Sequence, residues 1–192
     1  MAYLPCAAHN IQLVIKDGIT SDEKYVQLID RVSRNIVSKS KFSALIAEEL
    51  RNFDLKFAKK VVTRWNSILF MCRSVLKVSD VQLAKIRKKM ADNTQSEKTT
   101  KANFSISGIE REMIKELVTI LQWFEFATDE FQSNRVNISR VYPCIKFIEN
   151  KLSEDNDYNF SFTNTIRLEL RKSLNKRFLN HVSFKDDLFV LF

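Results

Sequence analysis

Glycine and proline are almost absent from this chain, which has two of each in 192 residues. Average proteins contain roughly 7% glycine and roughly 5% proline, the residues that form tight turns and interrupt regular structure. With so few turn residues, the many short connections of a β protein are hard to build. The scarcity therefore predicts an all-α fold of long helices, and no segment shows the alternation typical of a strand.

Apolar residues recur at helical spacing in several segments. The clearest stripe runs from Ile109 to Phe131, and Ser107 and Glu110 form a capping box before it. Residues 91–104 are almost purely polar and predict a mobile loop. The other helices are predicted from the stripes Cys6, His9 and Leu13; Tyr25, Ile29, Val32 and Ile36; Phe42, Leu45, Ile46 and Leu50; Trp65, Leu69, Cys72 and Leu76; Tyr142, Ile145 and Phe147; and Ile166, Leu170, Leu174 and Phe178.

Local signals predict where two of the helices begin and end. Gly18 is expected to end the first helix, since glycine favours helix C-termini. Thr20 and Glu23 form a second capping-box pattern, in which each side chain accepts a hydrogen bond from a free backbone N–H at the start of a helix. Ser79 or Asp80 is expected to start another helix further along the chain.

Positive charge is concentrated between Lys56 and Lys101. This segment holds 12 Lys and Arg against three acidic residues, while the rest of the chain is close to neutral and the total is +8. Clustered cations can displace the counterions condensed on a polyanion, so the segment predicts a surface that binds nucleic acid. A solvated helix face would have the same composition, and both interpretations stay open at this point.

The three cysteines do not form a disulfide or metal-binding pattern. Cys6, Cys72 and Cys144 are widely spaced and include no CxxC pair. Cys6 and His9 form a CxxH pair, but a structural zinc site needs four ligands and only two are local. We therefore predict no metal site, with a buried thiol and a hydrogen-bonded histidine. No stretch approaches the ~20 apolar residues of a membrane span, so no membrane partner is expected.

The residue patterns of most enzyme classes are missing. Two glycines exclude a glycine-rich phosphate-binding loop, and two histidines give no convincing Ser-His-Asp or Cys-His arrangement. The acidic pairs 48–49 and 186–187 are adjacent in sequence, so their side chains point to different sides of a helix and suit a shared metal poorly. We predict no catalytic residue in this chain.

Three passages together resemble hAT-family DNA transposases. Residues 6–17, CAAHNIQLVIKD, are similar to the CxxH helix of the family with its Lys-Asp ending. Residues 63–67 look like its TRWNS signature, and residues 138–143, ISRVYP, resemble the start of a later helix. The resemblance extends over nearly the whole chain. It implies that residues 1–18 belong to a ribonuclease-H-like core and that residues 19–192 form its helical insertion domain.

The resemblance also implies an enzyme whose active site lies outside this chain. In the family, acidic residues of the core hold divalent metal for strand cleavage and transfer, so Mg²⁺ or Mn²⁺ is expected in the intact transposase. Most of this core, a BED-type zinc finger and the dimerisation region are expected elsewhere in the protein. The chain should then be inactive alone and hold no cofactor. Its expected partners are DNA and the remaining parts of the transposase, in the nucleus.

The predicted DNA-binding residues have two sources. The resemblance implies that Trp65 stacks on a base flipped out of the DNA while Arg64 supports the nearby active site. The basic run Arg87, Lys88 and Lys89 is predicted from its charge to contact phosphates. Trp65 also falls on an apolar stripe at helical spacing, so a position in the core is an equally open interpretation.

Three functions are compatible with these features. The chain could be part of a DNA transposase, a domesticated DNA-binding module that has lost catalysis, or a helical module that binds other proteins. The residues themselves do not separate the three. For the transposase part and for the domesticated DNA-binding module, we expect DNA binding that is weak, poorly sequence-selective and strongly salt-dependent.

Overall fold

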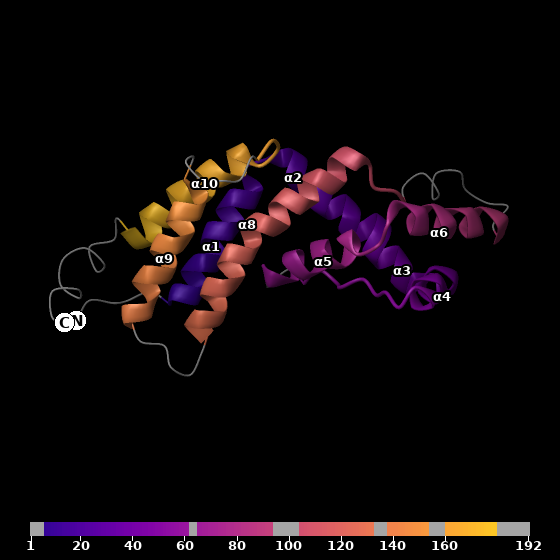
Figure 1. The fold of residues 1–192 in the computed structure, drawn as a ribbon, viewed down its shortest axis with the longest axis horizontal. Helices are drawn as coiled ribbons and strands as arrows, with labels where there is room; N and C mark the ends of the chain where they lie inside the picture. The colour runs from indigo at the N-terminus through magenta and orange to yellow at the C-terminus, as the bar shows by residue number, and fades with distance from the viewer. Residues whose placement is uncertain (1–5, 62–64, 94–103, 133–137, 154–159, 180–192) are drawn as a thin grey trace. The chain divides into compact units, whose positions relative to one another are not determined.

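The computed structural model describes residues 6–61, 65–93, 104–132, 138–153 and 160–179 (Figure 1). Every regular element in these ranges is a helix and none is a strand, so the predicted all-α class is confirmed for this part of the chain. No helix in the same ranges is both long and apolar enough to span a bilayer. The predicted loop at 91–104 lies mostly outside them, and its first residues belong to helix α6 (Asp80–Asn93).

The chain folds into two compact units. The first combines residues 1–23 with residues 119–192, and the second consists of residues 24–118. Helix α8 (Gly108–Gln132) contributes to both, because the boundary falls within it. The second unit is therefore one uninterrupted segment that lies between two parts of the first in sequence. The division at residue 18, which the resemblance implies, is a different one and stays a prediction.

The first unit is a bundle in which helices lie side by side (Figure 1). Its elements are α1 (Ala7–Thr20), the C-terminal part of α8, α9 (Ile138–Leu152), α10 (Asn164–Leu174) and the π-helical segment η2 (Asn175–Leu179). Helix α10 packs against both α1 and α9. The stripe predicted for the last helix is confirmed, because its four members are at most 1% exposed: Ile166, Leu170, Leu174 and Phe178.

Gly18 lies inside α1 and not at its end. The helix continues to Thr20, whose hydroxyl donates to the carbonyl oxygen of Lys16 at 2.8 Å. Both predictions for this turn are wrong, because Gly18 does not end the helix and Thr20 closes α1 instead of capping α2 (Glu23–Arg31). The reason is tertiary packing. A Cβ atom on Gly18 would lie 2.4 Å from Cδ2 of Leu170, so α1 meets α10 where only glycine fits.

A polar cluster beside Gly18 holds the same helices together. Asp17 Oδ2 accepts hydrogen bonds from Ser173 Oγ at 2.7 Å and from Arg177 Nη2 at 2.8 Å. Burial raises the pKa of Asp17, but these two hydrogen bonds, together with the positive charges of Arg177 and Lys176, outweigh it, so the pKa is lowered overall. A charged carboxylate on α1 thus joins both α10 and η2.

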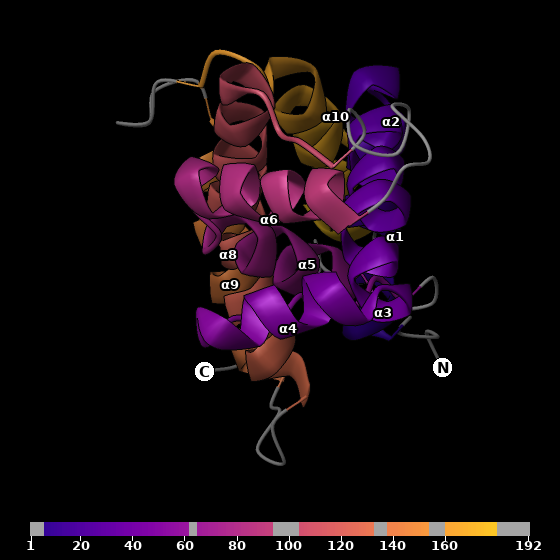
Figure 2. The ribbon, with the colours of Figure 1, turned by 90° about the vertical axis from the view of Figure 1, so that its right-hand side faces the viewer.

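The second unit contains α2, the π-helical segment η1 (Val32–Ser38), α3 (Lys39–Phe42), α4 (Ala44–Asn52), α5 (Asn66–Leu76), α6 and the N-terminal part of α8. Helices α3, α4 and α6 gather at one end of this unit (Figures 1 and 2). The stripe predicted for the helix after Thr20 is confirmed, since its members are at most 4% exposed: Tyr25, Ile29, Val32 and Ile36.

The predicted capping box at the start of α8 is confirmed. Ser107 N donates to Glu110 Oε2 at 2.8 Å, and Glu110 N donates to Ser107 Oγ at 3.2 Å. Arg31 of α2 also forms an ion pair with Glu110, which fastens the beginning of α8 to α2. A box of the same kind, formed by Ser79 and Gln82, starts α6.

Three large apolar residues that helical spacing assigned to buried stripes face solvent. Ile109 is 65% exposed in the first turn of α8, Phe42 is 91% exposed at the end of α3, and Phe147 is 39% exposed on α9. The stripe of α8 is buried farther along the helix, at Leu117, Ile120 and Phe124. Spacing shows which residues share a face, but burial also needs another element to cover that face.

We predict that Gly18→Ala destabilises the protein although alanine is the better helix former. The methyl group would lie 2.4 Å from Cδ2 of Leu170, and because Leu170 is fully buried, relieving the overlap requires the closely packed interior to shift. Overpacking of this kind costs about 1–3 kcal/mol, against about 1 kcal/mol gained in helix propensity. Chemical denaturation of the two proteins measures the difference.

Gly108→Ala is the matched control, since a Cβ atom at Gly108 meets nothing within 4 Å. We expect it to be neutral or to stabilise by up to about 1 kcal/mol. If both substitutions had the same effect on stability, the contact with Leu170 would not be the reason for glycine at position 18.

Candidate nucleic-acid interface

Charge is divided unequally between the two units. Residues 24–118 contain 20 Lys and Arg against 10 Asp and Glu, a net charge of +10. The first unit contains 11 basic and 13 acidic residues, a net charge of −2. The positive potential of the protein therefore belongs to the second unit, where it can attract a polyanion.

The basic run on α6 does not form a single face. Successive residues of a helix point about 100° apart, so Arg87, Lys88 and Lys89 project in different directions. Leu83 and Ile86 face the interior and are 3% and 0% exposed. Arg87 and Lys88 are exposed, and neither side chain has an ion pair or a hydrogen bond with any residue in the described ranges. These two are well placed to contact phosphates.

Lys89 is engaged inside the protein. Its ammonium group donates to Glu49 Oε1 of α4, and Asn52 Nδ2 donates to the same oxygen at 3.3 Å. The Glu49 side chain is only 3% exposed, and the hydrogen bond from Lys89 lowers its pKa. The ion pair holds α6 against α4. This is a packing role for Lys89, and its phosphate contact stays a prediction.

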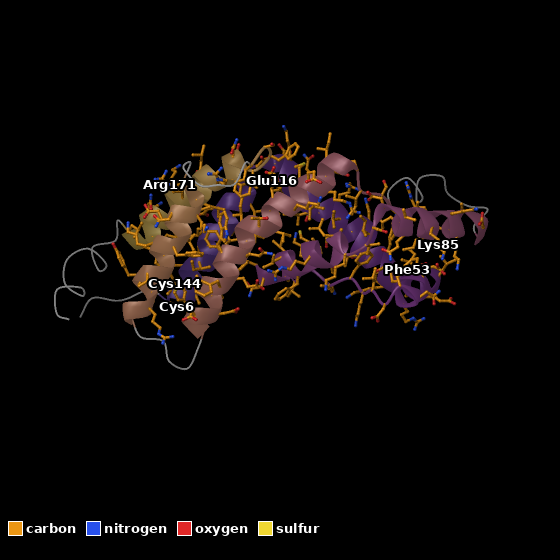
Figure 3. All side chains as sticks on the ribbon, in the orientation of Figure 1. Cys6, Phe53, Lys85, Glu116, Cys144 and Arg171 are labelled. Atoms are coloured by element: carbon orange, nitrogen blue, oxygen red, sulfur yellow. The ribbon has the colours of Figure 1, made fainter. Side chains whose placement is uncertain are left out.

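A second contact joins the same elements. Lys85 Nζ lies 5.3 Å from the centre of the Phe53 ring, which follows α4 (Figure 3). Such a contact contributes about 0.5–1 kcal/mol at exposed sites. Lys60 is used in a similar way, since its Nζ donates to Asp30 Oδ1 of α2 at 2.9 Å. Several of the cations counted in the sequence therefore stabilise the unit itself.

The remaining exposed cations are the candidates for phosphate contact. Their side chains form no ion pair and no hydrogen bond with any residue that the structure describes. They are Lys41, Arg51, Lys56, Lys59, Lys77, Arg87 and Lys88. Lys41 and Arg51 are missing from the predicted set, because they precede the segment of highest charge density. Counting charge over residues 24–118 would have found them.

Trp65 lies immediately before α5 and is 8% exposed. A ring buried to this extent offers no open face to a base in this conformation. The burial favours a core position for Trp65 in this chain, and its stacking role stays a prediction for the complex with DNA. Arg64 lies outside the described residues.

Cys6 and His9 are exposed, so the prediction of a buried thiol is wrong. The buried face of α1 is formed instead by residues such as Ile11, Val14 and Ile15. This face is turned away from the predicted stripe because α10 covers α1 from the other side. In the described part of the chain, no three metal-ligating side chains come together.

The other two cysteines are free and buried. Burial raises the pKa of the Cys72 thiol to about 12, and it also raises the pKa of Cys144. Thiols that stay protonated are poor nucleophiles and poor metal ligands. Neither cysteine is a candidate for catalysis.

The turn after α4 uses aspartate at a position where glycine is common. Asp54 has a φ of 54°, in the left-handed region. Asp54 N donates to the carbonyl oxygen of Arg51 at 2.9 Å, and Leu55 N donates to that of Leu50 at 2.8 Å. The two bonds form a Schellman motif, which ends α4 and fixes the backbone around Arg51.

No protein-family model, no curated protein and no solved structure matches this chain. These comparisons neither confirm nor refute the resemblance to hAT-family transposases. The case for a function therefore depends on the residues and geometry of the chain itself.

We predict that Asp54→Gly raises the free energy of unfolding by up to about 1 kcal/mol. A residue with a Cβ atom in the left-handed region costs about 1–2 kcal/mol, and the greater freedom of glycine in the unfolded chain removes part of the gain. Glu48→Gly, at an exposed position within α4, should instead destabilise by about 1 kcal/mol. Urea denaturation should show Asp54→Gly to be more stable than the wild type and Glu48→Gly to be less stable. An Asp54→Gly variant less stable than the wild type would exclude strain at this turn.

We predict that Lys89→Ala lowers the melting temperature by several degrees at neutral pH, whereas Lys88→Ala leaves it unchanged. Removing Lys89 leaves the Glu49 carboxylate buried without its cation, while Lys88 has no partner among the described residues. Because the pKa of Glu49 is lowered in the folded state, the ion pair stabilises the folded protein at neutral pH. This stabilisation is lost as the pH falls through the lowered pKa. The difference in melting temperature between wild type and Lys89→Ala should therefore become smaller in acid, and equal melting temperatures at neutral pH would contradict the packing role.

Proposed function

We propose that this chain is the helical insertion region of a hAT-like DNA transposase and that its basic unit binds DNA. The observation that carries DNA binding is the net charge of +10 on residues 24–118, together with exposed cations that have no partner among the described residues. Cations held within one compact unit can release several condensed counterions together, which supplies most of the affinity of non-specific DNA binding.

The transposase assignment draws on the CxxH pair, the TRWNS sequence and the ISRVYP passage. In this proposal, residues 19–192 interrupt a ribonuclease-H-like core that uses Mg²⁺ or Mn²⁺ for strand cleavage and transfer. The all-α character of the described residues is compatible with a helical insertion. In this proposal the insertion contributes no catalytic acid and its role is to bind DNA. The catalytic core and the dimerisation region are supplied by the rest of the protein, and the assembly acts in the nucleus.

The proposal retains Trp65 and Arg64 as DNA-binding residues of the intact assembly. Support comes from their match to the TRWNS sequence and from the basic connector that precedes them, with Lys56 and Lys59 exposed. Because Trp65 is buried, stacking on a base would require the start of α5 to open when DNA binds. Its burial also means that replacing Trp65 alone would test packing before it tested DNA binding.

A non-catalytic module is the alternative, either for DNA or for another protein. The protein-binding version is favoured by large apolar side chains on the surface of the second unit. Phe42 is 91% exposed, Val81 is 79% exposed and Ile109 is 65% exposed. Exposed apolar groups of this size are common at protein–protein contacts when they form a continuous patch.

We predict that the chain binds duplex DNA with little sequence preference and that its affinity falls steeply with salt. Arg87→Glu combined with Lys88→Glu should weaken binding by about tenfold or more, because two phosphate contacts become repulsive. The slope of affinity against salt concentration should also become less steep, by about one for each phosphate contact that is removed. Fluorescence anisotropy over a salt series measures both quantities.

Lys16→Glu combined with Lys172→Glu is the matched control, since both residues are exposed in the first unit and the change in total charge is the same. We expect this control to reduce affinity much less. An equal reduction in the two double variants would mean that only net charge matters. Absence of salt-dependent binding by the unmodified chain would remove DNA binding and favour the protein-interaction module.

A further inference from the structure

A pocket of about 360 Å³ lies in the second unit, between α3, α4 and the connector that follows α4. Ala47, Leu50, Leu55 and Phe57 give it an apolar wall, and Ser40 also lines it. Leu50 and Phe57 are 3% and 4% exposed, so this wall is part of the packed core. The volume lies at the lower end of the range for small-molecule sites, about 300–1,000 Å³.

Three cations complete the lining of this pocket: Lys41, Arg51 and Lys56. All three are exposed, and none forms an ion pair or a side-chain hydrogen bond with a described residue. Among the described residues that line the pocket, none is acidic. Glu48 and Asp54 are the acids closest to these cations in sequence, and neither lines the pocket. The site therefore offers an apolar surface beside an uncompensated charge of three.

The backbone around the pocket is fixed by hydrogen bonds that the sequence encodes locally. The Schellman motif at Asp54 binds Leu55 N to the carbonyl oxygen of Leu50, which brings two residues of the apolar wall together. It also holds Arg51 and Lys56 on either side of the same turn. On α3, the Ser40 hydroxyl donates to the carbonyl oxygen of Val37 at 2.7 Å, which satisfies its hydrogen bond inside the fold.

We propose that this pocket binds a nucleotide, with the base against the apolar wall and the phosphate among Lys41, Arg51 and Lys56. A base is a flat, compact group that packs on apolar side chains, and the half-buried Ala47 and Leu55 provide such a surface. A phosphate monoester carries nearly two negative charges and three acceptor oxygens at neutral pH, which suits several cations at once. The guanidinium group of Arg51 can bind two of these oxygens together.

A fatty acid or another monocarboxylate fits these features less well. A single carboxylate carries one charge and has no need of three cations. A long acyl chain also needs an extended apolar cavity, whereas this pocket is small and open to solvent on one side. The arrangement is thus better matched to a compact ring with a multiply charged group.

The nucleotide can come from two sources, a free nucleotide or an unpaired nucleotide of a DNA strand. The second source rests on the proposed DNA binding, and it would make the unit prefer single-stranded over duplex DNA. In a duplex the bases are stacked and paired, so a base must first leave the helix to reach the pocket.

The test is a charge-neutral variant that fills the pocket, Ala47→Phe. Ala47 is half-buried in the pocket wall, so the larger side chain occupies the space of a base without changing any cation. The full chain and the variant are titrated with dAMP, with a single strand of a dozen deoxyadenylates and with a duplex of the same length. We expect the variant to bind dAMP and the single strand about tenfold more weakly, with duplex binding changed less than about twofold.

A second variant guards against a folding defect and tests the charged part of the site. Arg51→Gln combined with Lys56→Gln leaves the apolar wall intact, and Lys16→Gln combined with Lys172→Gln removes the same charge from exposed positions of the first unit. We expect the pocket pair to reduce dAMP affinity at least about tenfold and the first-unit pair to leave it unchanged. Circular dichroism and thermal melting of each variant establish that it is folded.

The outcomes separate this proposal from the proposed function. Suppose that the unmodified chain binds DNA and that the folded pocket variants bind dAMP and the single strand as well as it does. This result would overturn the nucleotide site and leave the proposed DNA binding intact. Binding of dAMP without binding of any DNA would support the site, identify the free nucleotide as its source and remove the proposed function. Absence of binding to all three probes would overturn both.

Discussion

The close packing of α1 on α10 depends on the absence of a side chain at Gly18, because any Cβ atom there would overlap Leu170. The hydrogen bonds of Asp17 to Ser173 and Arg177 lie at the same contact and use the short distance between the helices. Residues far apart in sequence are joined here, which closes the first unit from two separate parts of the chain. The segment between those parts, residues 24–118, is then free to form a second unit with a composition of its own.

That composition is strongly basic, but its cations are of two kinds. Lys60 and Lys89 bind acidic side chains of α2 and α4 and hold elements of the unit together, so little of their charge is available to a ligand. Others, such as Lys56, Arg87 and Lys88, are exposed and have no partner in the described ranges. A charge count from sequence therefore overestimates the binding surface, because it cannot tell which cations neutralise a buried acid.

Elements specified by neighbouring residues could be predicted from the sequence, and those specified by distant contacts could not. The capping box of Ser107 and Glu110 is local, and it forms as predicted. The prediction that Gly18 ends a helix is wrong because the residue that requires glycine there, Leu170, lies on α10, more than a hundred residues away in sequence. The exposed side of α1 at Cys6 and His9 was missed for the same reason. At the candidate site, α6 and its cations were predictable from composition, whereas the pocket depends on a left-handed aspartate that no sequence signal marks.

Helix α4 connects the two parts of the candidate site. Its consecutive residues Glu49, Leu50 and Arg51 point in different directions: Glu49 binds Lys89 of α6, Leu50 forms the wall of the pocket, and Arg51 supplies one of its cations. The ion pair and the contact of Lys85 with Phe53 hold α6 against α4 and the turn after it. The exposed cations of α6 thus stand on a helix fastened to the wall of the pocket. If phosphates bind on α6 while a base occupies the pocket, both contacts are made by one packed set of helices. Replacing Lys89 should then weaken the coupling between phosphate binding on α6 and base binding in the pocket, although Lys89 touches neither group.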